Sequence, residues 1–234
     1  MVQTVAGKGE KDNFGRLRSD IIHCRTCPRL VRFREAVAEK KSRRFEDWDY
    51  WAKPVPGFGD ANAELVIIGL APAAHGGNRT GRVFTGDLSA KFLISCLYQT
   101  GFTNQPNSDA FDDGLMMNNA YMLAAVRCVP PDNIPTPSES LNCFPFLDRE
   151  LRLLTNTKAV LLLGKFAFDS YVRFMKGTIG QAYGRVAFRH GAVHASHGRP
   201  TIYVSYHPSP RNTNTGTLTR EMFISLLERI KSDL

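Results

Sequence analysis

Four short runs of apolar residues are spread along the chain, separated by longer polar or amphipathic segments. A short continuous apolar run predicts a strand that is buried on both faces of a sheet. We therefore expect strands at residues 64–70, 121–128, 158–164 and 201–206.

The segments between these runs show helical periodicity. A helix over residues 14–40 is expected to be interrupted at residues 24–28, and further helices are expected at residues 165–175 and 218–234. The last of these is expected to bury three residues spaced by four, Met222, Leu226 and Ile230. Another helix ends at Gly101, and its apolar stripe consists of Leu88, Phe92, Leu93, Cys96 and Leu97.

Thr136 and Glu139 form a capping box with Pro137 at the first helical position, which predicts the start of another helix. The inward-facing residues expected on that helix are Phe146, Leu147, Leu151 and Leu154.

Strands that alternate with helices predict an α/β fold with one parallel sheet covered on both faces. An irregular hairpin is expected at residues 184–193, before the last strand. The chain shows no internal repeat and no long linker, so residues 1–234 are expected to form a single domain, with residues 1–13 flexible.

The composition, 43% hydrophobic and 22% charged, matches an ordinary globular protein. No run approaches the length of a transmembrane helix, and the start lacks the apolar segment of a secretory signal. We expect a cytoplasmic protein without a membrane partner.

Basic residues outnumber acidic ones, 30 to 22, giving a net charge of +8. Many of them lie within residues 16–44. A basic surface suits nucleic acid or an anionic membrane face, although a solvated helix face is the simpler alternative.

The chain has five cysteines. Cys24 and Cys27 form a Cys-x-x-Cys pair, and 14 residues rich in proline separate Cys128, at a strand end, from Cys143, in a helix. Cys96 lies on an apolar stripe and is expected to be a buried hydrophobic residue. The spacing favours one metal centre held by the other four over two unrelated pairs of reduced thiols, and it is compatible with zinc or [4Fe–4S].

Two loops follow predicted strands, at residues 69–87 and 207–212. The first lacks the Gly-Lys-Ser/Thr ending of a phosphate loop. If the strands are parallel, both loops lie at the carboxyl edge of the sheet, where α/β proteins bind ligands.

Three residues of these loops are candidates for chemistry, and each has a structural alternative. Asp87 could be only a helix N-cap, His207 could only brace a turn, and Phe84 could belong to the core. His75 is a weaker candidate, because nothing in its surroundings specifies a role.

Residues 69–87 (GLAPAAHGGNRTGRVFTGD) and 206–216 (YHPSPRNTNTG) together resemble two motifs of the uracil-DNA glycosylase superfamily. The resemblance is closest to family V, the iron–sulfur UDGb group, and covers about residues 21–228. The family fold is a three-layer domain with a four-stranded parallel sheet between helices. The resemblance implies that a structural [4Fe–4S] cluster is held by Cys24, Cys27, Cys128 and Cys143.

Two positions separate this sequence from the sister family IV. Leu70 stands where that family has a glutamate, and Ala124 stands where it has an asparagine that reads uracil. The loss of both polar groups implies a less selective pocket, which accepts uracil and other deaminated bases such as hypoxanthine.

The resemblance implies a DNA repair enzyme that flips a base out of DNA and hydrolyses its N-glycosidic bond, leaving an abasic site. The expected partner is double-stranded DNA with uracil or another deaminated base, with single-stranded DNA left open, and the expected state is a monomer. The motifs contain no lysine, so no lyase step is expected.

The implied catalytic roles fall to three residues. Asp87 would orient the attacking water and stabilise the cationic sugar, and His207 would stabilise the departing base anion. Asn133 would hold the water, although it could equally be a turn residue.

Further residues are assigned to binding. The base pocket is expected to be formed by Gly69, Leu70, Ala71, Phe84, Ala124 and Ser209, with Phe84 stacked on the base. The expected DNA contacts are Arg82, Arg211 and Asn214.

Two alternatives belong to other classes of protein. A catalytically silent DNA-damage binder would share the fold, and a zinc-dependent RNA-binding module would hold zinc instead of iron.

Overall fold

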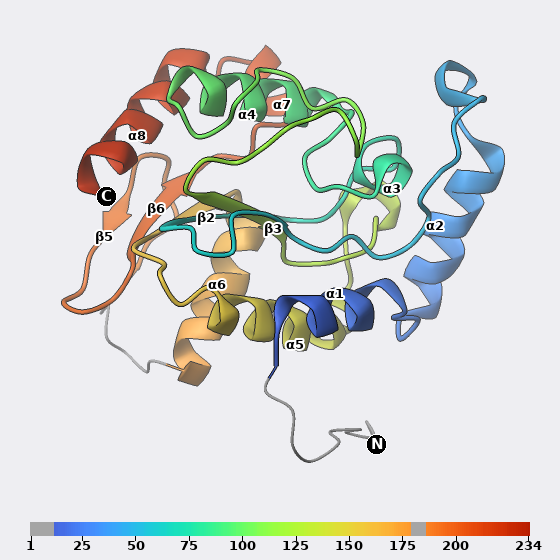
Figure 1. Cartoon of the computed structure of the whole chain (residues 1–234), viewed down its shortest axis with the longest axis horizontal. Coiled ribbons are helices and arrows are strands. Elements are labelled where there is room, and N and C mark those ends of the chain that lie inside the picture. The colour runs from blue at the N-terminus through green and yellow to red at the C-terminus, as the bar shows by residue number, and fades with distance from the viewer. Residues whose placement is uncertain (1–11, 179–185) are drawn as a thin grey trace.

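A six-stranded mixed sheet with helices on both faces lies at the centre of the computed structural model, which describes residues 12–178 and 186–234 (Figure 1). The strand order is β1-β3-β2-β4-β6-β5. The four inner strands are parallel, and they are β3 (Ala120–Ala124), β2 (Leu65–Gly69), β4 (Ala159–Leu163) and β6 (Thr201–Ser205). The α/β fold and its four parallel strands are therefore confirmed.

Two short antiparallel strands at the sheet edges extend the expected set of four. They are β1 (Phe58–Gly59), which pairs with β3, and β5 (Val193–His194), which pairs with β6. The hairpin expected at residues 184–193 is not seen in its described part, residues 186–193; an antiparallel pair is instead formed by β5 with the last strand, β6, and residues 184–185 lie outside the described residues. Of the expected flexible start, residues 1–11 also lie outside them.

The strand that contains Ala124 is shorter than expected, and Cys128 does not end it. β2 stops at Gly69, and the amides of Ala125 and Val126 bond the last carbonyls that this neighbour offers. Among residues 12–178 and 186–234, no strand pairs with the residues that follow Val126, so Cys128 lies in the loop beyond.

The inner strands are buried on both faces because their side chains alternate between two cores. Val66 and Ile68 pack in one core with residues of α5 (Pro137–Leu153) and α6 (Lys165–Thr178). Leu65 and Ile67 pack in the other with residues of α4 (Leu88–Gln99) and α8 (Arg220–Asp233). In Figure 1, α4 and α8 lie above the sheet, and α1 (Phe14–Ile22), α5 and α6 lie below it.

The capping box is present at Thr136 and Glu139, and the break between α1 and α2 (Pro28–Lys40) confirms the interrupted helix. Two residues expected in the core are exposed, Leu88 by 65% and Met222 by 37%. Both lie in the first turn of a helix, Leu88 in α4 and Met222 in α8. The buried residues of each helix lie further along it. No helix within residues 12–178 and 186–234 is long and apolar enough to span a bilayer.

Short helical segments complete the structure around the carboxyl edge of the sheet. They are η1 (Arg43–Phe45), α3 (Gly77–Thr80), η2 (Pro131–Asn133) and α7 (Pro210–Asn214). α3, η2 and α7 follow β2, β3 and β6, so their residues meet at one edge of the sheet.

Candidate active site

A cavity of about 660 Å³ lies at the carboxyl edge of the parallel strands. Volumes of this order accommodate small molecules of nucleobase size. The structure brings most of the expected site residues into its wall: Leu70, Ala71, Phe84, Asp87, Ala124, Asn133, His207, Ser209 and Arg211.

Asp87 has two roles in the structure, because it caps a helix and also faces the cavity. Its Oδ1 accepts the amide hydrogens of Ser89 at 2.8 Å and Ala90 at 3.0 Å. Its Oδ2 lies where a Cβ at Gly76 would come within 2.3 Å, so only a glycine leaves room for the carboxylate. Burial raises the pKa of Asp87, against the opposing effects of the two amides and of Arg79.

His207 enters the cavity from the loop that follows β6. The side-chain amide of Asn212 donates to the His207 carbonyl at 2.8 Å and fixes the backbone there. Burial lowers the pKa of His207 to about 4. The ring is therefore neutral near pH 7 and carries one N–H donor.

Phe84 holds its ring in the cavity wall with a strained backbone, at a φ of +47°. The ring packs on Gly69, where a Cβ would lie 2.5 Å from the ring Cζ. Gly69 therefore lies behind Phe84 and supports the ring, instead of facing the cavity.

Asn133 reaches the cavity from η2, which follows β3 and carries two consecutive left-handed residues. Asp132 has a φ of +55° and Asn133 a φ of +57°, a conformation that asparagine and aspartate tolerate better than most residues. Asn133 is therefore a turn residue that also lines the cavity.

The three expected DNA contacts have different surroundings. Arg211 lines the cavity and is exposed, and Asn214 is exposed at the end of α7 but lies outside the cavity wall. The expectation for Arg82 is wrong, because this residue is only 2% exposed. Its Nη2 lies 2.7 Å from Asp113 Oδ2 and 3.0 Å from Ser108 Oγ, so it is committed to a buried ion pair.

One cavity-lining residue, Leu88, was expected in the core. Leu88 directly follows Asp87, the N-cap of α4. This position in the sequence could have predicted that Leu88 lines the cavity, because the first turn of α4 lies at the carboxyl edge of the sheet.

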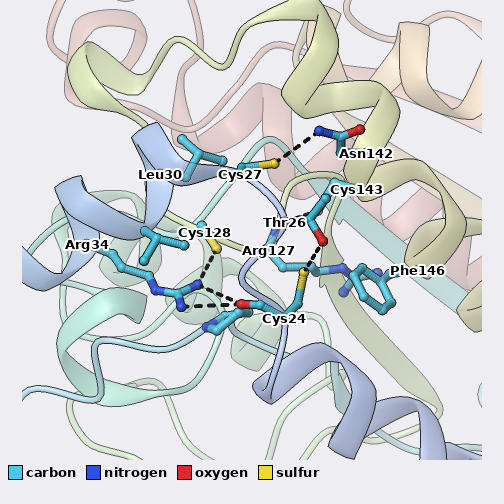
Figure 2. A pocket seen from close by; sticks show the side chains of 12 residues that line it. Cys24, Thr26, Cys27, Leu30, Arg34, Arg127, Cys128, Asn142, Cys143 and Phe146 are labelled. Carbon is cyan, nitrogen blue, oxygen red and sulfur yellow. Dashed lines mark hydrogen bonds between the residues drawn. The ribbon is translucent and has the colours of Figure 1, made fainter. Parts of the chain in front are cut away.

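The four cysteines of the expected metal centre line a second cavity (Figure 2). Cys24 and Cys27 lie between α1 and α2, Cys128 lies in the loop after β3, and Cys143 lies on α5. Cys96 is buried elsewhere, as expected. Within residues 12–178 and 186–234, no three His, Cys, Asp or Glu side chains are close enough to hold a metal as placed.

Polar groups nevertheless surround these thiols. Arg34 Nη1 donates to Cys128 Sγ at 2.9 Å, and the amide of Arg127 donates to Cys143 Sγ at 3.2 Å (Figure 2). Burial raises the pKa of Cys128 to about 11 and that of Cys143 to about 12. Both arginines are almost fully buried, and the Nε of each has no hydrogen-bond partner.

The cysteine cavity fits a group that would convert buried thiols into thiolates. An all-thiolate donor set suits soft metals and iron–sulfur clusters. The buried guanidinium of Arg34, which donates to Cys128, would offset part of the negative charge of such a centre, whereas the guanidinium of Arg127 already pairs with Glu150.

The model of the uracil DNA glycosylase superfamily matches residues 56–231, a range that contains the whole candidate active site. The chain belongs to the uracil-DNA glycosylase superfamily.

Relatives in this superfamily align over most of the chain. A type-5 uracil-DNA glycosylase from Pyrobaculum aerophilum is 45% identical and covers 91% of this chain and 90% of its own length. A type-5 enzyme from Thermus thermophilus is also 45% identical, over 89% of this chain and 92% of its own. A type-4 uracil-DNA glycosylase from Thermotoga maritima is 26% identical over 76% of this chain and 81% of its own.

Proposed function

We propose that this chain is a type-5, family V uracil-DNA glycosylase that removes uracil and other deaminated bases from double-stranded DNA as a monomer. The observation that carries the proposal is the meeting of Asp87 and His207 in one cavity, from loops far apart in the sequence. The similarity to type-5 enzymes over nine-tenths of the chain supports the same reaction.

The reaction needs a hydrogen-bond donor for the departing base. Cleavage of the N-glycosidic bond leaves negative charge on the base, and a donor aimed at that charge is worth roughly 3–4 kcal/mol. The neutral ring of His207 provides one N–H in a largely buried position. It donates to the base anion without carrying a full positive charge into the pocket.

The reaction also needs an acceptor for the attacking water. Breaking the bond leaves positive charge on the sugar, and the carboxylate of Asp87 stabilises that charge and orients the water. Asn133 faces the same cavity and supplies an amide that holds the water against Asp87. The nucleophile is water, because no lysine among the described residues lines the cavity. The product is therefore an intact strand with an abasic site.

Apolar groups dominate the part of the wall that would face the base. Phe84 stacks on the flipped base, and Leu70 and Ala124 offer no side-chain hydrogen bond. A pocket without a polar reader rejects related bases weakly. Hypoxanthine is therefore accepted alongside uracil.

We propose that Cys24, Cys27, Cys128 and Cys143 hold a [4Fe–4S] cluster. The cluster, when bound, supplies a structural cross-link and no chemistry at the base. It ties the junction of α1 and α2 to the loop after β3 and to α5, because one cavity collects thiols from all three. Analysis of anaerobically purified protein should find about four irons and equivalent acid-labile sulfide per chain. Zinc without iron would overturn the cluster proposal.

The test of the enzymatic proposal is excision from a duplex with one uracil opposite guanine. Alkali is added afterwards to half of each sample, and duplexes with hypoxanthine or with a thymine–guanine mismatch run alongside. Cleavage that appears only after alkali is the expected result. Tight binding without cleavage would replace the enzyme with a silent damage binder, and cleavage without alkali would contradict the absence of a lyase step.

A further inference from the structure

Arg79 is a buried cation within the loop that carries Asp87, with only 3% of its surface exposed. Its guanidinium lies over the rings of both Phe45 and Trp48, 4.0 Å from each ring centroid, and the two rings are nearly perpendicular to each other. An aromatic face close to a guanidinium stabilises its charge where water is excluded, and Arg79 has two such faces. Phe45 and Trp48 lie about thirty residues before Arg79 in the sequence. The position of this cation therefore depends on a segment outside its own loop.

The hydrogen bonds of Arg79 end on the backbone at both sides of its own loop. Nε donates to the carbonyl of His75 at 2.7 Å, and Nη2 donates to the carbonyl of Gly86 at 3.3 Å. Gly86 has a φ of +79°, and a Cβ there would lie 2.2 Å from Nη2. Only glycine combines this conformation with this close approach. Gly86 directly precedes Asp87. The hydrogen bond from Arg79 to the Gly86 carbonyl therefore fixes the backbone position from which the Asp87 side chain extends.

The charge of Arg79 also acts on Asp87. Burial raises the pKa of Asp87, whereas the amides of Ser89 and Ala90 and the positive charge of Arg79 lower it. One guanidinium nitrogen of Arg79, Nη1, is buried without a hydrogen-bond partner. The other titratable side chains that line the cavity are His75, His207 and Arg211.

We propose that Arg79 is a positioning residue for base excision: its guanidinium fixes the turn before Asp87 and holds a buried positive charge next to the residue that precedes Asp87. Phe45 and Trp48 hold the guanidinium in a place that water does not reach. The inference rests on the proposed function, in which the carboxylate form of Asp87 orients water and stabilises the cationic sugar.

The test is the pH profile of single-turnover excision from the uracil duplex, with enzyme in excess. The rate falls on the acid side as Asp87 takes up a proton. Arg79→Met should move this acid limb to higher pH, because the variant removes a positive charge that lowers the pKa of Asp87. Arg79→Lys keeps the charge but loses the forked geometry, so its plateau should fall while its acid limb stays in place.

Two more variants make the result specific. Trp48→Leu removes one ring, leaves the charge and lets water reach it, so the acid limb should move in the same direction by a smaller amount. It decides the question if Arg79→Met does not fold. Arg152→Met, at an exposed ion pair on α5, is the control and should leave limb and plateau unchanged.

An acid limb that stays in place in both Arg79→Met and Trp48→Leu would overturn the inference, even if their plateaus fall. If the wild type still excises uracil, that result would make Arg79 a purely structural residue and would leave the proposed function intact. A wild type that leaves the duplex intact at every pH would instead overturn the proposed function.

Discussion

The buried Arg82 forms an ion pair with the half-buried Asp113, in which Nη2 lies 2.7 Å from Oδ2. The same guanidinium donates to Ser108 Oγ, and the carbonyl of Ser108 accepts the amide of Gly86 at 2.7 Å. The pair therefore joins the loop that carries Asp87 to the segment around residues 108–113. Its location in the interior makes Arg82 a structural residue and not a phosphate contact.

Arg82→Met should lower the free energy of unfolding by about 2–3 kcal/mol, because it takes the ion-pair partner from the half-buried carboxylate of Asp113, which keeps only its backbone amide donors. Urea denaturation measures this change. Arg211→Met is the matched control, since Arg211 is exposed at the cavity and should lose DNA affinity with little change in stability. The interpretation is wrong if Arg82→Met keeps its stability and loses DNA affinity instead.

The buried His207 should make the stability of the protein depend on acid. Its pKa is about 4 in the folded state, below the ordinary value of 6.5. As the pH falls from 6.5 to 4, His207 binds a proton in the unfolded chain but stays neutral in the folded chain. The free energy of unfolding therefore falls over this range. Above pH 6.5 this contribution is fully present.

His207→Asn should remove this dependence. Urea denaturation at pH 7 and at pH 4.5 measures it, and the wild type should lose more stability than the variant between the two. Equal losses in both proteins would show that His207 is not held neutral by burial.

Gly69→Ala should impair catalysis through the ring of Phe84. The new Cβ would lie 2.5 Å from Phe84 Cζ, so the ring must move into the base pocket. We expect a loss of about tenfold to a hundredfold in single-turnover excision, in line with the cost of misplacing a group by an ångström. Gly177→Ala is the control, because a Cβ there meets nothing within 4 Å. Full activity of Gly69→Ala would contradict the stacking role of Phe84.

Cys128→Ser should lower both the iron content and the melting temperature. A ligand that contributes to a metal centre contributes to folding, because the centre does not form in the unfolded chain. Cys96→Ala is the matched control and should keep its iron, since Cys96 lies on the core face of α4 and away from the other cysteines. Unchanged stability of an iron-free Cys128→Ser would contradict a structural role for the cluster.

The sequence could predict the inner strands and the edge where the loops meet. Val66 and Ile68 face one core while Leu65 and Ile67 face the other, and burial on both faces produces a continuous apolar run. The short edge strands β1 and β5 have two residues each, too few to show a periodicity.

The surroundings of individual charges could not be predicted. Arg82 and Arg79 are equally basic in the sequence, and their burial depends on partners far along the chain, Asp113 for the first and Trp48 for the second. Leu88 was misplaced because helical periodicity shows which face is apolar but not where the covering surface ends.

The central claim is that Asp87 and His207 break the N-glycosidic bond. It is tested most directly by the single-turnover rates of the wild type, Asp87→Asn and His207→Asn on one uracil duplex, with folding and DNA binding measured in parallel. We expect each variant to fold and bind DNA but to excise at least about a hundredfold more slowly, as for a lost catalytic donor. Losses below about threefold in folded, DNA-binding variants would contradict the claim.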